Sequence, residues 1–181
     1  MTEPNDTSKR GVFADSAPEE SSTPGAKPLF SPEAIEHIAP TDQAQRDDDL
    51  TTLLRNDHVY RSIMIGPKCV LTLRDIKTRQ FLSARRMAQY VDTKQTMQHD
   101  SISSMKYELA LSIVSYKIDE VEVPMASLES DNKDEALKAF SDRLEMIDGW
   151  PLSLWSRAIE AFRVLMEYIN QISSPESLVD F

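Results

Sequence analysis

The chain has 181 residues, 40% of them hydrophobic and 28% charged, and its formal net charge at pH 7 is −10. This composition is typical of one globular domain with a polar appendage, and it argues against a fully disordered chain or a chain of several domains. No run approaches the roughly 18 consecutive apolar residues that a membrane-spanning helix needs, and the first thirty residues lack the pattern of a secretory signal. A single cysteine, Cys69, excludes an intramolecular disulfide and suits a reducing compartment.

The first 49 residues have the composition of a disordered acidic arm. Residues 1–50 contain six of the ten prolines and two of the four glycines, and their net charge is −7. Such a segment cannot bury enough apolar area to offset the entropy lost on ordering. A capping residue, a first-turn proline and three apolar anchors stand out within it, and these are Ser31, Pro32, Phe30, Ile35 and Ile38. They predict either a short helix over 31–38 that forms on binding, to a partner or to its own domain, or a solvated tail.

A globular domain is predicted over residues 50–173, and it begins with a β-hairpin. Apolar and polar residues alternate in HVYRSIMI (58–65) and CVLTLR (69–74), as expected for half-buried strands. The intervening Gly66-Pro67-Lys68 is typical of a turn. Asp75 is placed to cap a helix that begins at Ile76. Because Cys69 lies inside a strand pattern, we interpret it as a small buried hydrophobe.

Three more helices and a short strand are predicted beyond this point. Apolar spacing favours helices over residues 101–116, 131–147 and 151–172, and DEVEVPM (119–125) is extended. The last helix repeats apolar residues every three or four positions, at Trp155, Ile159, Phe162, Met166 and Ile169. This two-heptad seam either faces the core of a small bundle or docks a partner helix.

The expected fold class is therefore α+β. It comprises a small antiparallel β-hairpin, extended to three strands if 119–125 joins it, packed on about four α-helices. The disordered arm precedes this domain, and residues 174–181 form a short C-terminal tail.

No pattern in the sequence points to catalysis. With four glycines in the whole chain, a glycine-rich phosphate loop is missing. His37, His58 and His99 lie far apart, without the spacing of metal ligands. We expect a protein that is not an enzyme and that has no catalytic residue, no metal site and no cofactor.

The clearest physical signal is the segregation of charge. Residues 61–95 have a net charge of +6, whereas residues 96–181 have a net charge of −9. A basic block between acidic ones can meet an acidic protein, nucleic acid or the chain's own arm. Nucleic acid is the least favoured, because few aromatic residues accompany the basic ones and the overall charge repels phosphates.

The order of these parts resembles the small tail and baseplate-hub assembly chaperones of tailed bacteriophages. The resemblance covers roughly residues 58–172 and rests on TLRDIKTRQF (72–81), within VLTLRDIKTRQFLSARR (70–86), and on the closing helix WSRAIEAFRVLMEYINQI (155–172). It implies a non-catalytic protein of the host cell cytoplasm that binds an aggregation-prone tail or baseplate-hub subunit and releases it during assembly. Such binding needs an apolar groove with a charged rim.

The expected partner-binding residues follow from this function. For the groove they are Trp155, Phe162, Met166 and Ile169, and for the rim they are Arg79, Arg85 and Arg86. Each of the apolar residues is equally compatible with a place in the core, and for Trp155 the core is favoured. Two other functions stay open, a structural virion protein such as a tail or baseplate adaptor, and a regulatory binding module.

Overall fold

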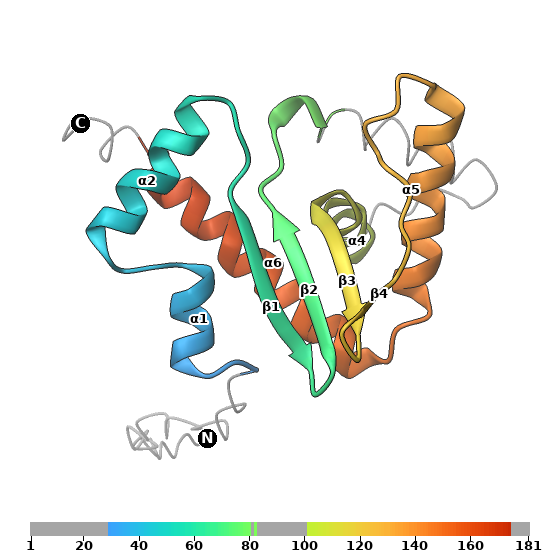
Figure 1. The fold of residues 1–181 in the computed structure, drawn as a ribbon, viewed down its shortest axis with the longest axis horizontal. Helices are drawn as coiled ribbons and strands as arrows, with labels where there is room; N and C mark the ends of the chain where they lie inside the picture. Colours follow the sequence, from blue (N-terminus) through green and yellow to red (C-terminus); the bar gives the residue numbers. More distant parts are fainter. Residues whose placement is uncertain (1–28, 81, 83–100, 175–181) are drawn as a thin grey trace, which may run out of the picture.

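The protein has an α+β fold, as the sequence predicts. Its computed structural model describes residues 29–80, 82 and 101–174. In this part of the chain, five helices pack with one four-stranded antiparallel sheet of order β1-β2-β3-β4 (Figure 1). The elements are α1 (Pro32–Ile38), α2 (Gln43–Leu54), β1 (Tyr60–Gly66), β2 (Cys69–Arg74), α4 (Ser101–Ser112), β3 (Ile113–Ile118), β4 (Val121–Glu122), α5 (Lys133–Asp148) and α6 (Leu152–Ile172).

The predicted hairpin is confirmed and forms one half of the sheet. Strands β1 and β2 pair with Ile63 opposite Leu71 and Met64 opposite Val70. Because successive side chains of a strand point to opposite faces, Ile63 and Leu71 are buried beneath the helices while Met64 is 62% exposed. Helices α4 and α6 lie behind the sheet in Figure 1, and the other face carries no helix there.

The sheet is larger than predicted, because the expected helix over 101–116 ends early. Helix α4 stops at Ser112, and β3 follows without a linker and pairs with β2, with Tyr116 opposite Leu71. Ile113 is β-branched and Tyr116 aromatic, which favours a strand that packs against a neighbour. Of the extended piece predicted at 119–125, two residues form β4, and they pair with the end of β3.

A buried arginine accompanies the change from helix to strand. From α5, the Arg143 guanidinium donates to the carbonyl oxygens of Ala110, Ile113 and Ala126. Burial lowers the pKa of Arg143 to about 10. Backbone carbonyls in the last turn of a helix have no N–H donor within that helix. The guanidinium of Arg143 supplies the missing donor at the end of α4.

The predicted boundary of the arm is wrong in the structure. The short helix over 31–38 is present as α1, with Ser31 Oγ accepting from the Ala34 N–H at 3.3 Å. It packs on the protein's own core, where Phe30 and Ile38 are buried. Helix α2 continues the folded part across the expected boundary at residue 49. The remainder of the predicted arm, residues 1–28, and the tail from residue 175 lie outside the described residues.

Helices α5 and α6 match the predicted ones closely. Asn132 caps α5 by accepting from the Asp134 N–H at 3.0 Å, and α6 is the longest described helix, with 21 residues. Its inner side buries Ala158, Ala161, Leu165 and Tyr168, small and large residues together, which lets α6 lie close to the sheet. None of the described helices is long and apolar enough to cross a membrane.

Candidate functional site

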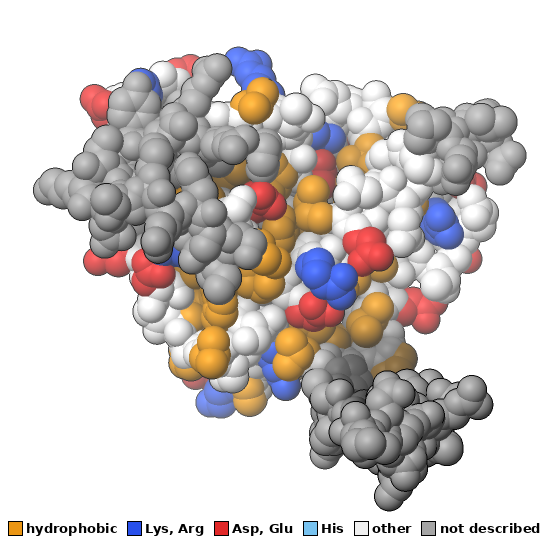
Figure 2. Space-filling model, turned by 180° about the vertical axis from the view of Figure 1, so that it is seen from behind, with side chains coloured by type: hydrophobic (Ala, Val, Ile, Leu, Met, Phe, Trp, Pro, Cys, Tyr) orange, Lys and Arg blue, Asp and Glu red, His pale blue; other side chains and the backbone are white. Residues whose placement is uncertain are grey.

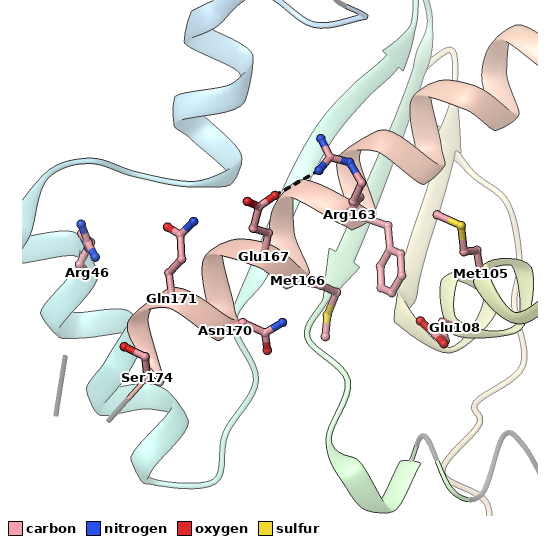
Figure 3. Close-up of a pocket in the computed structure, with 10 residues that line it drawn as sticks. Arg46, Met105, Glu108, Arg163, Met166, Glu167, Asn170, Gln171 and Ser174 are labelled. Atoms are coloured by element: carbon pink, nitrogen blue, oxygen red, sulfur yellow. Dashed lines mark hydrogen bonds and ion pairs between the residues drawn. The ribbon is translucent and has the colours of Figure 1, made fainter. Parts of the chain in front are cut away.

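A trough lies along α6 on the described surface. Its volume is about 910 Å³, and it is open along its length (Figure 3). Helix α6 is its floor, and single residues or pairs from α2 and α4 form its two sides. The lining residues are Arg46, Met105, Glu108, Phe162, Arg163, Met166, Glu167, Asn170, Gln171 and Ser174.

The floor of the trough has two parallel rows of side chains. One row is Phe162, Met166 and Asn170, and the other is Arg163, Glu167 and Gln171, each spaced by four residues. Rows with this spacing are the ridges that a second helix meets when it packs on the first. The first row begins with apolar residues and the second with charged ones, and Figure 2, which looks onto this side, shows a hydrophobic band beside charged side chains.

The apolar part of the floor continues onto α4. Met105 lines the trough beside Phe162 and Met166, and Figure 3 shows its side chain facing α6. Phe162 is buried, whereas both methionines are only half-buried. Methionine is flexible and polarizable, so two of them give a contact surface that can adapt to different shapes.

The charged residues of the floor form an ion-pair cluster with one another. Arg163 bonds the carboxylate of Glu160 at 2.8 and 3.0 Å and that of Glu167 at 3.1 Å. The hydrogen bond from Arg163 lowers the pKa of Glu160, and the bond to Glu160 in turn raises the pKa of Arg163. Because one arginine is shared between two carboxylates, the three groups are engaged with one another but retain one net negative charge.

The α2 side of the trough is fixed by a buried polar cluster. Asp49 accepts a hydrogen bond from Tyr168 Oη at 2.6 Å and forms an ion pair with Arg61. Arg61 also donates to the carbonyl oxygen of Ile38 at 3.2 Å. Burial, together with the bond to Asp49, raises the pKa of Tyr168. The cluster thus joins α2, β1 and α6, and it holds Arg46, one helical turn before Asp49, at the trough.

Part of the predicted binding set lies at this site. Phe162 and Met166 line the trough, whereas Trp155 is half-buried and Ile169 buried outside it. Arg79 is exposed and is not among the lining residues, and Arg85 and Arg86 lie outside the described residues. Of the four predicted groove residues, two line the trough and two do not.

The sides of the trough were missed by the sequence reasoning. Arg46 was assigned to the disordered arm, and Met105 and Glu108 to an amphipathic helix without a site. In the sequence, Met105 and Glu108 are linked only by their separation of three residues, which places them on one face of a helix.

Most of the described basic residues in the block 61–95 form ion pairs with acidic residues of the same chain. Four of its residues form ion pairs: Arg61 with Asp49, Lys68 with Asp119, Arg74 with Glu129 and Lys77 with Asp75. The first of these links the block to the predicted arm, since Asp49 is its last residue. Arg79, the remaining described basic residue of the block, forms no ion pair with a described residue.

A carboxylate and a histidine meet near the end of β2, but their atoms are engaged in holding the chain. Asp75 Oδ1 accepts from the Val59 N–H at 2.8 Å and lies 3.1 Å from His58 Nδ1. His58 Nε2 lies 3.3 Å from Gln80 Nε2. The prediction that Asp75 caps the following helix is therefore wrong, because its carboxylate is buried against β1. The cluster ties the two strands together.

Within the described residues, no group of three or more His, Cys, Asp or Glu side chains could hold a metal ion. A scan of family models, a search of curated proteins and a search of solved structures each gave no match. The trough along α6 is therefore the candidate site on geometric grounds.

Proposed function

We propose that the protein is a non-catalytic assembly chaperone that holds a helical segment of one tail or baseplate-hub subunit in the trough along α6. The observation that supports this is the form of the trough. It is open along a helix, it has an apolar strip of two methionines and a phenylalanine, and charged residues border that strip. Amphipathic helices bind to grooves of this kind through apolar residues spaced by three or four.

The identity of the partner rests on the resemblance to phage assembly chaperones. An assembly subunit exposes apolar helices before it meets its neighbours, and a chaperone must cover them reversibly. A half-buried methionine surface suits this task, because it offers apolar contact without demanding one fixed shape. Release then needs no chemical step.

The function is tested by a tagged pulldown from the producing cells, with mass spectrometry of the proteins recovered and an inventory of purified particles. We expect one tail or hub subunit in the pulldown and no copy of this chain in finished particles. A fixed copy number in particles would make it a structural component instead. Recovery of polymerase or nucleic acid would point to the regulatory function.

The site is tested by the substitution Met166→Glu. A carboxylate placed on the apolar floor would have to lose water on binding, so we expect the affinity for the recovered subunit to fall at least about tenfold. The matched control is Met64→Glu, since Met64 is 62% exposed on the opposite face of the sheet. Equal losses in both variants, or none in either, would place the binding surface elsewhere.

A further inference from the structure

The two sides of the trough carry opposite charges that the described residues leave unpaired. The guanidinium of Arg46, on α2, forms no hydrogen bond or ion pair with a described residue, and the carboxylate of Glu108, on α4, accepts only a hydrogen bond from Ser104 Oγ at 3.2 Å. Figure 3 shows the two residues on opposite sides of α6. Both are half-buried.

We infer that the trough selects an amphipathic helix whose apolar stripe has acidic residues along one flank and basic residues along the other. The inference rests on the proposed function and specifies the chemistry of its partner. The apolar stripe would lie on Phe162, Met166 and Met105, the acidic flank would face Arg46, and the basic flank would face Glu108.

The physical reason is charge complementarity across a narrow contact. A bound helix partly excludes water from Arg46 and Glu108, so a like charge placed against either one is repelled more strongly than it would be in solvent. The floor cluster of Arg163, Glu160 and Glu167 retains one net negative charge, which is the same in the wild type and in variants of Arg46 or Glu108. A change of preference between these proteins therefore comes from the two sides.

The same arrangement sets the direction of the bound helix. When the apolar stripe faces α6, reversing the helix end for end exchanges its left and right flanks. A helix with one acidic and one basic flank can satisfy both sides in one direction only. The partner segment is thus held with a defined polarity along α6.

The experiment uses three synthetic 18-residue helical peptides with the same leucine and methionine stripe. One peptide has an acidic and a basic flank, one has two acidic flanks, and one has two basic flanks. Binding of fluorescein-labelled peptides is measured by anisotropy at about 0.15 M salt, where the Debye length is about 8 Å and attraction to distant charges is weak. The proteins are the wild type, Arg46→Glu and Glu108→Arg, each checked for an unchanged circular dichroism spectrum.

We expect the preferred peptide to follow the signs of the two sides. The wild type should bind the mixed peptide most tightly, Arg46→Glu the peptide with two basic flanks, and Glu108→Arg the peptide with two acidic flanks. Each preference should be about tenfold, since attraction is exchanged for repulsion at one side. Arg79→Glu is the matched control, because it reverses a charge that lies outside the trough, and it should leave the ranking of the wild type unchanged.

The failure of this inference differs from the failure of the proposed function. If peptides bind but their ranking is the same in all variants, or if Arg79→Glu shifts it as Arg46→Glu does, the selection by the two sides is overturned. If no peptide binds any of the proteins, a helix is not the occupant of the trough, and the proposed function loses its site.

Discussion

At the scale of single residues, the buried carboxylate of Asp49 joins three elements of the fold. Asp49 is buried and serves two partners from distant parts of the sequence, Arg61 on β1 and Tyr168 on α6. Ion pairs at the surface contribute little, but a buried charge that loses its partner is costly. Helix α2 buries Asp49 and Leu50 and packs Leu53 against the core, so Asp49 supplies the polar part of its attachment.

Replacing Asp49 by alanine should therefore lower the free energy of unfolding by about 3 kcal/mol, because Arg61 would remain buried without a counter-charge. Urea denaturation followed by circular dichroism measures the change. The neighbouring Asp48 is exposed on the same helix, so Asp48→Ala should change stability by no more than about 0.5 kcal/mol. Similar effects of the two substitutions would show that the cluster does not hold α2.

At the scale of elements, the turn between β3 and β4 carries avoidable strain. Asp119 and Glu120 both have positive φ, 51° and 67°, in a two-residue connection. This is the left-handed conformation, which favours glycine or asparagine over glutamate.

Glu120→Gly should therefore raise the free energy of unfolding by about 0.5 to 1 kcal/mol. The same substitution two residues along, Glu122→Gly, should have the opposite sign, since it places glycine in a strand. Thermal unfolding of both variants provides the comparison. A loss of stability in Glu120→Gly would mean that the carboxylate makes a contact worth more than the strain.

The elements that could be predicted from sequence are those whose own residues decide their conformation. Alternation over 58–65 and 69–74 was enough for the hairpin, and apolar spacing was enough for α5 and α6. Strand β3 was missed because Ile113 and Val114 continue the helical pattern of α4, and pairing with β2 decides between the two. Helix α2 was missed because its stabilising residue is Asp49, and its partners lie 12 and 119 residues away.

The residues of the candidate site likewise fall into those that the sequence could predict and those that it could not. Phe162 and Met166 share a helix face, so their spacing identified them as a surface that either packs or binds. Arg46, Met105 and Glu108 reach the trough from other helices, and a sequence does not give the distance between helices. Residue type alone also predicted too much. Arg79 is basic and Trp155 and Ile169 are apolar, but none of the three lines the trough.

At the scale of the whole molecule, the folded unit begins well before residue 50. If residues 1–48 were a disordered arm, as their composition predicts, their removal would leave the unfolding midpoint nearly unchanged. The structure reverses this expectation, because Phe30 and Ile38 are part of the core and Arg61 donates to the carbonyl oxygen of Ile38.

A pair of substitutions on α1 tests this without shortening the chain. Ile38 is fully buried and Ile35 is 38% exposed. Ile38→Ala should cost about 3 kcal/mol of stability, through lost burial and the cavity left behind, whereas Ile35→Ala should cost less than about 1 kcal/mol. Denaturant unfolding measures both. Equal small effects would mean that α1 is not part of the cooperative unit.

The direct passage from α4 into β3 has a mechanical consequence. Ser112 ends the helix and Ile113 begins the strand, so the junction has no slack. The trough wall that carries Met105 and Glu108 is thereby continuous with a strand paired in the middle of the sheet, and Arg143 clamps both sides of the junction. A load applied to this wall is carried into the sheet, while the opposite wall, α2, is joined to the core by Asp49 and by the apolar residues Leu50 and Leu53. We therefore expect the α4 side of the trough to be the more rigid one and the α2 side to be the one that adjusts to the width of a bound segment.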